Sequence, residues 1–304
     1  MKNNLNLAFF GTPDFAVPAL NKLLENSWKI SAVYASPFSS PVKTEAGKHD
    51  IKIYQPRTLK DDAVFEEFKA LKPNLAIVAA YGKIIPARYL EIPKHGFVNI
   101  HPSLLPKYRG PSPIQTAILN GDDKTGVSIM VVDQEVDHGP IIKTRDVELQ
   151  THECYPEMEK RLAEEGAELL IEVLPEFVAG KIKPKEQNHK KATFTKMFER
   201  EDGKINWRKP ARKICGQVRA LNPEPGTWTT WQGKILNIFK AEELRTNLDS
   251  KNKPGAVVNI QKSIAVKTET CYLNLNSIQL EGGKVMDAKS FVNGHPDFLN
   301  SVLE

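Results

Sequence analysis

The chain has 304 residues, of which 40% are hydrophobic and 26% are charged. This composition is typical of a soluble globular protein, and the length allows two domains with cores of ordinary size. No stretch approaches the roughly 20 apolar residues that span a bilayer, and no signal-peptide h-region precedes the first apolar run. The three cysteines lack the spacing of a disulfide framework or a zinc site. We therefore expect a cytoplasmic protein with no membrane association and no bound metal.

The first 180 residues alternate between predicted strands and helices. Apolar runs predict strands at residues 5–10, 30–35, 75–80 and 97–100. Amphipathic spacing predicts a helix that begins at Pro13-Asp14, a second over 61–71, and a long third from about 151 to 180, in which Pro175 kinks or ends the final turn. This alternation predicts an α/β fold, with a Rossmann-like and mostly parallel sheet. Ligands of such sheets bind beyond the carboxyl ends of the strands.

The remaining third of the chain has a different pattern. Residues from about 181 to 208 have no sustained period, so we read them as an extended connector. A helix follows over 210–220, with Arg212, Lys213 and Arg219 on its outward face. Short alternating runs at 227–231, 234–239, 256–260, 264–268 and 272–280 then predict a small β-barrel. We divide the chain into a catalytic domain at 1–188, a linker at 189–208 and a carboxy-terminal domain at 209–304.

Charge is distributed unevenly along the chain. Residues 1–180 carry 20 Lys and Arg against 24 Asp and Glu, whereas residues 181–304 carry 22 against 13, a net charge of +9. A basic back half suggests contact with a polyanion. Nine basic residues fall between positions 190 and 213, with Phe194, Phe198 and Trp207 among them. A solvated linker would show the same charges, so nucleic-acid binding and simple solvation both remain open.

The run from Val98 to Pro106 contains the most informative residues. Alternate residues of a strand point the same way, so Asn99 and His101 share one face. Pro102 and Pro106 stiffen the loop that follows. A donor amide beside a titratable ring is suited to stabilising negative charge that develops on a substrate oxygen. The alternative is that both residues merely end the strand.

These residues belong to a longer pattern. Asn99-x-His101-x-Ser103-Leu104-Leu105-Pro106, followed 36 residues after His101 by Asp137 within Val136-Asp137-His138-Gly139, resembles the signature of folate-dependent formyltransferases. The resemblance extends over nearly the whole chain and is strongest to the members that formylate methionyl-tRNA. It implies a Rossmann-like domain followed by an OB-like barrel. Further matches occur in order at residues 10–15, 40–43, 80–86, 113–115, 126–130 and 202–207.

The resemblance also implies a reaction and roles for individual residues. The formyl group of 10-formyltetrahydrofolate would pass to the amino group of methionine on initiator methionyl-tRNA, releasing tetrahydrofolate. Asn99 would donate a hydrogen bond to the formyl oxygen, His101 would bond the same oxygen and pass on a proton, and Asp137 would orient the imidazole. The residues that would line the folate site are Ser103, Leu104, Leu105, Pro106, Tyr81, Gly82 and Ile84.

The tRNA would lie on basic residues, for which we predict Lys43, Arg109, Lys204, Arg208, Arg212 and Lys213. The chain departs from the family here, because relatives carry a long loop with a basic tip before the Ser40-Pro41-Val42-Lys43 element. In this chain residues 35–39 lead directly into that element. Discrimination of the initiator is therefore expected to be weaker or to depend on other residues. His138 stands where relatives carry a small or hydroxyl residue. For the oligomeric state, we expect a monomer.

Two other functions remain open at this point. The chain could formylate an amino-sugar nucleotide or another small amine, which would use the same first domain. It could also be a nucleic-acid-binding protein with an inactive front domain. A serine hydrolase is disfavoured because no G-x-S-x-G elbow surrounds Ser103. The absence of a G-x-G-x-x-G fingerprint and of a Walker motif disfavours a dinucleotide or ATP.

Overall fold

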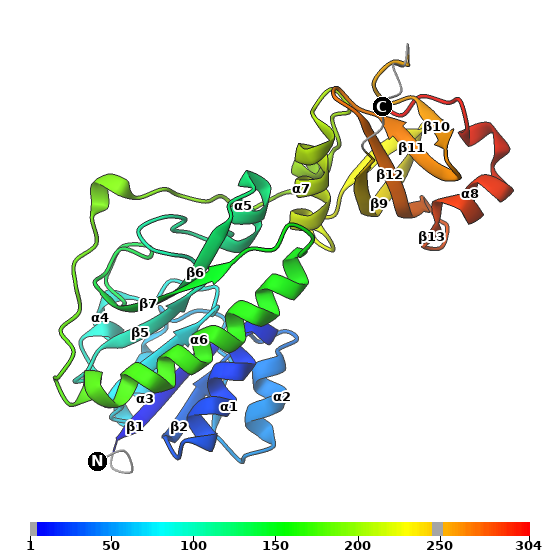
Figure 1. Ribbon diagram of the computed structural model, residues 1–304. Coiled ribbons are helices and arrows are strands. Elements are labelled where there is room, and N and C mark those ends of the chain that lie inside the picture. The colour runs from blue at the N-terminus through cyan, green and yellow to red at the C-terminus, as the bar shows by residue number, and fades with distance from the viewer. Residues whose placement is uncertain (1–4, 245–251) are drawn as a thin grey trace. The chain divides into compact units, whose positions relative to one another are not determined.

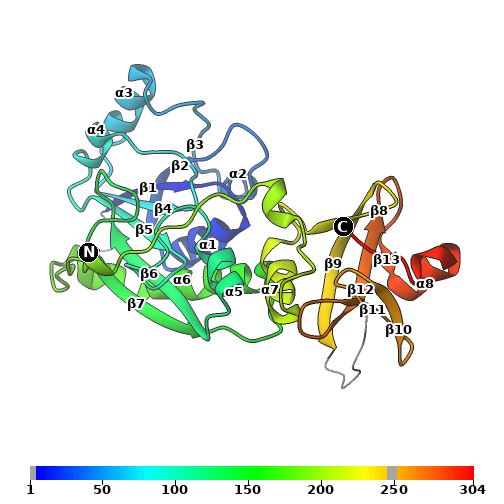
Figure 2. The ribbon, with the colours of Figure 1, turned by 90° about the horizontal axis from the view of Figure 1, so that it is seen from above.

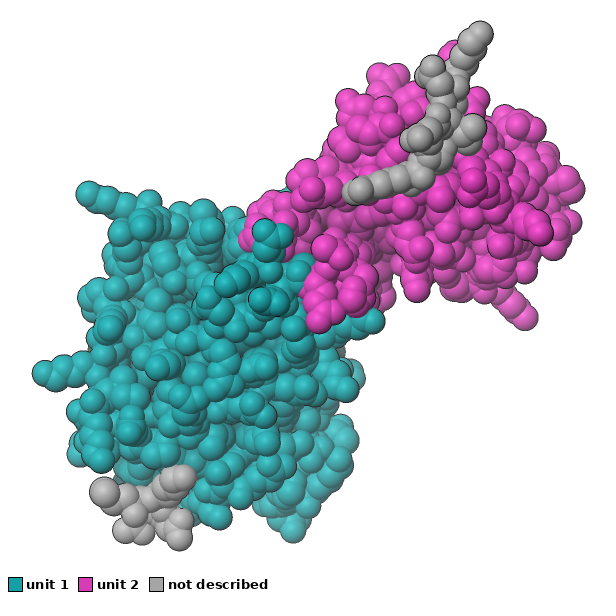
Figure 3. All heavy atoms as spheres, in the orientation of Figure 1, with its two compact units in different colours: residues 1–114, 123–149, 156–196 teal, residues 115–122, 150–155, 197–304 magenta. Residues whose placement is uncertain are grey.

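The computed structural model of the chain describes residues 5–244 and 252–304. The chain forms two compact units (Figure 3). The first comprises the residues up to 114 together with 123–149 and 156–196, and the second comprises 115–122, 150–155 and 197–304. Among the described residues, no helix is long and apolar enough to cross a bilayer.

The first unit is built on a seven-stranded sheet with the order β3-β2-β1-β4-β5-β6-β7. The neighbours from β3 to β5 are parallel, whereas β6 runs antiparallel to β5 and β7 antiparallel to β6. Every residue of β4 is buried, as expected for a strand covered on both faces. The strands are β1 (Asn6–Gly11), β2 (Lys29–Tyr34), β3 (Ile53–Tyr54), β4 (Leu75–Ala79), β5 (Phe97–His101), β6 (Lys124–Val131) and β7 (Ile141–Glu148).

Helices cover both faces of this sheet (Figures 1 and 2). α1 and α6 lie on one face, and α3 and α4 on the other. The short turn η2 (Asp14–Ala16) leads into α1, and the side chain of Asp61 accepts the backbone N–H of Ala63 to cap α3. The helices of the first unit are α1 (Val17–Glu25), α2 (Pro41–Gly47), α3 (Asp62–Ala70), α4 (Ala87–Leu90) and α6 (Tyr155–Val178), whereas most of α5 (Pro113–Asn120) belongs to the second unit.

The long helix α6 begins later than predicted and continues past its proline. Met158, Leu162 and Val173 are buried, as the predicted apolar stripe requires. Pro175 lies inside the helix and does not end it, because the backbone N–H of Ala179 still donates to the Pro175 carbonyl at 3.2 Å. A proline removes only its own N–H bond, and one further turn forms beyond it.

An aromatic cluster fills the face of the sheet that carries α3 and α4. Phe10 packs against Tyr34, Tyr81 and Phe97, with ring centroids 4.5–5.4 Å apart. The hydroxyl groups of Tyr34, Tyr81 and Tyr89 are buried in this cluster without a hydrogen-bond partner. Burial raises the pKa of Tyr34 and Tyr81 above the ordinary tyrosine range. The cluster therefore holds polar groups whose hydration is lost on folding.

The second unit contains a mostly antiparallel sheet with the order β10-β11-β12-β9-β8, and β13 pairs with β12. Ile214 and Val218 of α7 belong to the same core as Trp231. The predicted Rossmann-like sheet domain followed by a small barrel-like domain is thus confirmed. The elements are α7 (Ala211–Leu221), β8 (Trp228–Trp231), β9 (Lys234–Leu244), β10 (Val257–Ile260), β11 (Ser263–Lys267), β12 (Tyr272–Leu280), β13 (Met286–Asp287) and α8 (Ala288–Gly294), with short turns η3 (His189–Lys191) in the first unit and η4 (Arg200–Gly203) and η5 (Pro296–Phe298) in the second.

The outward face predicted for α7 is only partly right. Arg212 and Lys213 are exposed, but Arg219 is half-buried and donates from Nη1 to the carbonyl of Glu153 at 2.9 Å. Burial lowers the pKa of this guanidinium. The prediction for Arg219 was wrong because a long side chain at the edge of an amphipathic helix can turn back onto neighbouring backbone.

Candidate active site

Strand β5 places two of the predicted catalytic residues at its carboxyl end. Asn99 pairs in register with Val78 of β4 and Met130 of β6, and His101 pairs with Ser128. By strand alternation Asn99 and His101 share the face of Phe97, which is the face of the aromatic cluster. His101 is only 4% exposed, whereas Asn99 is partly exposed. The amide can therefore reach a ligand at the sheet edge, while the imidazole is held inside the protein.

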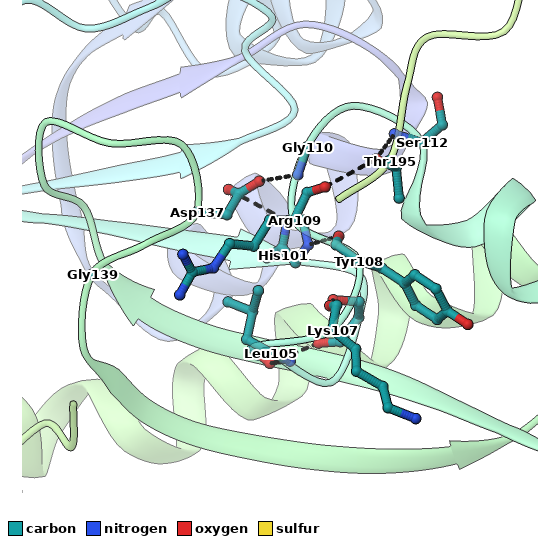
Figure 4. A network of polar contacts seen from close by, with 12 residues as sticks. His101, Leu105, Lys107, Tyr108, Arg109, Gly110, Ser112, Asp137, Gly139 and Thr195 are labelled. Carbon is teal, nitrogen blue, oxygen red and sulfur yellow. Dashed lines mark hydrogen bonds and ion pairs between the residues drawn. The ribbon is translucent and has the colours of Figure 1, made fainter. Parts of the chain in front are cut away.

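The loop after β5, drawn in Figure 4, is held by hydrogen bonds within itself and to β6. The Ser103 hydroxyl donates to the carbonyl of Lys107, and the Ser128 hydroxyl donates to the carbonyl of Ser103, both at 2.6 Å. Ser128 also accepts the backbone N–H of Leu105 at 3.1 Å. The peptide bond between Leu105 and Pro106 is cis. The polar atoms of Ser103 are thus used within the loop, and this residue shapes the loop from inside.

His101 is held between two oxygen acceptors. Its Nε2 lies 2.9 Å from the carbonyl of Tyr108, and because a carbonyl only accepts, this nitrogen carries the hydrogen. Its Nδ1 lies 3.5 Å from Oδ1 of Asp137, which is ion-pair distance but longer than a good hydrogen bond. The second carboxylate oxygen of Asp137 accepts the backbone N–H of Gly110 at 2.8 Å. Figure 4 shows Asp137 and His101 pointing toward each other, His101 from the end of β5 and Asp137 from the loop between β6 and β7.

Asp137 lies on the connection between β6 and β7, which reaches back to His101. Its φ angle is +49°, in the left-handed region that non-glycine residues rarely adopt. The structure thus brings Asp137 to the imidazole of His101, with Asn99 two residues earlier on the same strand face. Side chains separated by 36 positions in the sequence meet at one point.

The residues predicted to bind folate differ in their exposure. Tyr81 is 4% exposed, and its ring packs in the aromatic cluster rather than toward solvent. Ile84 is 85% exposed and Gly82 is exposed, so these two remain accessible. Leu105 is buried, whereas Leu104 and Pro106 are partly exposed. Part of this set is therefore accessible to a ligand, whereas Tyr81 and Ser103 are buried within the protein.

The predicted phosphate-binding residues also divide into two groups. Lys43 on α2 is exposed, as are four residues of the second unit, Lys204, Arg208, Arg212 and Lys213. Arg109 is different, because it is 3% exposed and its guanidinium is bonded inside the first unit. A guanidinium buried in this way does not face a phosphate on the surface. Arg109 therefore supports the loop that follows β5, residues 102–112, which we call the catalytic loop after its predicted role.

Sequence reasoning missed the contribution of the connector. The backbone N–H of Arg109 donates to the carbonyl of Thr193 at 2.9 Å, and the N–H of Thr195 donates to the carbonyl of Arg109 at 2.8 Å. The Thr193 hydroxyl accepts the N–H of Tyr108, and the Thr195 hydroxyl accepts the N–H of Ser112. This segment, predicted from the sequence as an extended connector, thus binds the loop that follows β5. Backbone pairing of this kind leaves no periodic signal in the sequence.

Comparison with known proteins agrees with this organisation. The profile of the family described as formyl transferase matches residues 5–174, and that of the formyl transferase carboxy-terminal domain matches residues 197–296. The methionyl-tRNA formyltransferase of Bacillus cytotoxicus is 36% identical over 302 residues, which cover 95% of this chain and 96% of the relative. That of Roseiflexus castenholzii is 39% identical over 302 residues, which cover 96% of each chain.

A solved structure supports the fold alone. The N-formyltransferase from Helicobacter canadensis, crystallised with folinic acid and dTDP-3-aminofucose, superimposes with a TM-score of 0.69 at 20% identity. The match covers 93% of this chain and 100% of that one. With a family profile over more than half of its length and full-length relatives above 35% identity, the chain belongs to the formyl transferase family.

Proposed function

We propose that the protein transfers the formyl group of 10-formyltetrahydrofolate to the amino group of methionine on initiator methionyl-tRNA. The observation that carries this proposal is the pairing of His101 with Asp137 beside Asn99 at the carboxyl end of β5. Relatives that share more than a third of their residues with this chain, over nearly the full length of both, bear the name methionyl-tRNA formyltransferase.

The reaction requires charge to develop on an oxygen. The neutral amine attacks the formyl carbon, and the electron pair of the C=O π bond moves to oxygen. The carbon–nitrogen bond to the folate then breaks, the folate nitrogen takes up a proton, and the amine loses one. The side-chain NH₂ of Asn99 would donate to the oxyanion, a contribution whose removal typically costs about 10²–10³ in turnover.

His101 acts from a more enclosed position than the sequence suggested. Both ring nitrogens are engaged by protein oxygens, Nε2 by Tyr108 and Nδ1 by Asp137. For Nε2 to donate to the formyl oxygen, its hydrogen must be shared between that oxygen and the Tyr108 carbonyl, or its bond to the Tyr108 carbonyl must break. Asp137 holds the ring through Nδ1 during that exchange. The catalytic loop around Tyr108 is thus expected to adjust when both substrates are bound.

The basic surface of the second unit supports tRNA as the formyl acceptor. Its exposed Lys204, Arg208, Arg212 and Lys213 supply positive charge for tRNA phosphates. Lys204 also lies over the ring of Trp228, with its Nζ 5.4 Å from the ring centroid. Lys43 on the first unit would add a further phosphate contact. Such contacts position the acceptor but do not read its sequence, so initiator selectivity is expected to be modest.

An amino-sugar nucleotide is the second candidate acceptor. The Helicobacter canadensis enzyme named above was crystallised with such a molecule, but at 20% identity this likeness concerns the fold. The net charge of +9 in residues 181–304 is not needed for a small substrate. These observations favour tRNA.

The test compares acceptors directly. The protein is incubated with 10-formyltetrahydrofolate and, separately, with methionyl initiator tRNA, methionyl elongator tRNA and a dTDP-amino sugar. Formyl transfer is expected to initiator tRNA at the highest kcat/KM, and Asn99→Ala is expected to lower it by about 10²–10³. A higher kcat/KM for the sugar nucleotide, or full activity of Asn99→Ala, would overturn the proposal.

A further inference from the structure

The side chain of Gln187 joins the loop that follows β5 to the loop that carries Asp137. It lies on the connector after α6 and is 5% exposed. Its Nε2 donates to the carbonyl of Asp137 at 2.9 Å and to that of Gly139 at 2.8 Å. Its Oε1 accepts from Arg109, at 3.2 Å from Nε and 2.7 Å from Nη2. Both amide hydrogens and both lone pairs of the oxygen are therefore used.

Arg109 transmits this connection to the loop after β5. Its backbone is paired with Thr193 and Thr195, and its Nη2 also lies 2.9 Å from Nδ1 of His189. The next residue, Gly110, donates its N–H to the Asp137 carboxylate. Asp137 is thus fixed at two points, since Gln187 binds its carbonyl and Gly110 binds its carboxylate.

The backbone of Asp137 needs such support. Its φ angle of +49° is disfavoured for a residue with a side chain, and a conformation of this kind persists only where surrounding bonds determine it. The two hydrogen bonds from Gln187, to the carbonyls of Asp137 and Gly139, hold the backbone that follows the Asp137 Cα. Releasing them would allow the loop to relax and move the carboxylate away from His101.

We propose that Gln187 is a positioning residue, which holds the Asp137 carboxylate at ion-pair distance from His101 by clamping the Asp137 loop to Arg109. The inference rests on the proposed function because it assigns Gln187 an effect on turnover through Asp137. On this proposal the connector that carries Gln187 contributes to the active site and does more than link two parts of the chain.

The test uses a substitution that keeps the size of the side chain. Gln187→Glu retains an oxygen that can accept from Arg109 but places a second oxygen against the carbonyls of Asp137 and Gly139. We expect kcat to fall by about 10- to 100-fold, the effect typical of a catalytic group displaced by about 1 Å. The KM values of both substrates are expected to change less than about threefold, because Gln187 touches neither. Gln187→Met removes the bonds to Asp137 and Gly139 without repulsion, together with the acceptor for Arg109, and is expected to lower kcat in the same way.

The second unit offers a matched control. Gln217 of α7 is 8% exposed, and its Nε2 donates to the carbonyls of Asp202 and Lys204 at 2.7 and 3.1 Å. Gln217→Glu thus breaks two equivalent bonds away from Asp137. It is expected to lower thermal stability as much as Gln187→Glu does while leaving kcat within about threefold of wild type.

Two readouts separate positioning from general destabilisation. In the Asp137→Asn background, Gln187→Glu should lower kcat by less than about threefold, because both changes act on one interaction. Hydrogen exchange of the Gly110 amide should accelerate in Gln187→Glu and stay unchanged in Gln217→Glu.

Wild-type kcat in both Gln187 variants, or a loss that multiplies fully with Asp137→Asn, would overturn the inference. If Asp137→Asn alone retained wild-type activity, the proposed catalytic role of Asp137 would fail instead, which distinguishes the two outcomes.

Discussion

Replacing Asp137 by Asn removes one charge beside His101 and changes little else. The two side chains have the same shape, and the Asn oxygen can still accept the Gly110 N–H that now lies 2.8 Å from the carboxylate. The change therefore tests the charge pair itself. His101 Nδ1 and Asp137 Oδ1 are 3.5 Å apart, and the Asp137 side chain is 15% exposed.

The magnitude follows from this distance. An imidazolium at His101 and the Asp137 carboxylate, 3.5 Å apart, would attract by about 5 kcal/mol at an effective dielectric constant of about 20. Part of this attraction is present before the reaction and does not affect the barrier. We therefore expect a loss of about 3 kcal/mol of transition-state stabilisation, which is roughly a hundredfold decrease in kcat. Single-turnover formyl transfer to initiator methionyl-tRNA at saturating 10-formyltetrahydrofolate measures this quantity.

A second carboxylate on the same loop provides the control. Asp133 Oδ2 lies 2.6 Å from Nδ1 of His138, whose ring stacks on that of His189. Asp133→Asn removes an equivalent carboxylate–histidine contact that does not touch His101. Its kcat is expected to stay within about threefold of wild type. The reasoning is refuted if Asp137→Asn stays within that range, or if Asp133→Asn loses as much activity.

Three further predictions concern stability and binding. Tyr34→Phe should stabilise the protein by about 1 kcal/mol in urea unfolding, because it removes a buried hydroxyl without a partner. Burial raises the pKa of Tyr34 in the folded state, so its contribution to the free energy of unfolding is constant below a pH of about 10, and stability declines above that pH. This alkaline decline should be smaller in Tyr34→Phe. An identical alkaline profile in the variant would count against the burial of the Tyr34 hydroxyl. Gly126→Ala places a Cβ against the backbone of β7 and 2.5 Å from a methyl group of Leu104, so it should destabilise the protein by about 1–3 kcal/mol and raise the KM for the formyl donor; an unchanged melting temperature would contradict this packing. Charge reversal of Lys204 and Arg208 should weaken tRNA binding and reduce the slope of log affinity against log salt by about 1 per residue, measured by filter binding, whereas an unchanged slope would exclude both from the phosphate-binding surface.

Strands with strong apolar runs could be predicted, whereas β6 and β7 were not assigned. β4 is buried throughout, so its sequence is continuously apolar. β7 lies at the edge of the sheet, and most of its exposed positions carry charged residues, which hides the pattern. The short helices α2 and α4 have seven and four residues, too few for a helical period to be recognised.

The residues of the candidate site likewise fall into those that the sequence predicts and those that only the tertiary fold brings together. Asn99 and His101 could be found because they share a short strand, and Asp137 because it lies in a recognisable motif. Arg109 looked like a surface cation, since its sequence gives no sign that Gln187 accepts its N–H groups. Gln187 itself lies in a charged, aperiodic stretch, and its role depends on contacts with residues about 50 and 78 positions away. Contacts of that range are decided by the tertiary fold.

The dependence of the catalytic loop on residues 187–195 limits how such enzymes can be recombined. A chimera joined at the end of α6 would keep Asn99, His101 and Asp137 but receive its Gln187, Thr193 and Thr195 equivalents from another parent. A fragment ending at residue 174, where the first family profile stops, would lack them altogether. Crossovers placed after Thr195 retain the parental support for both loops, so exchange of the part of the second unit that follows residue 196 should preserve turnover.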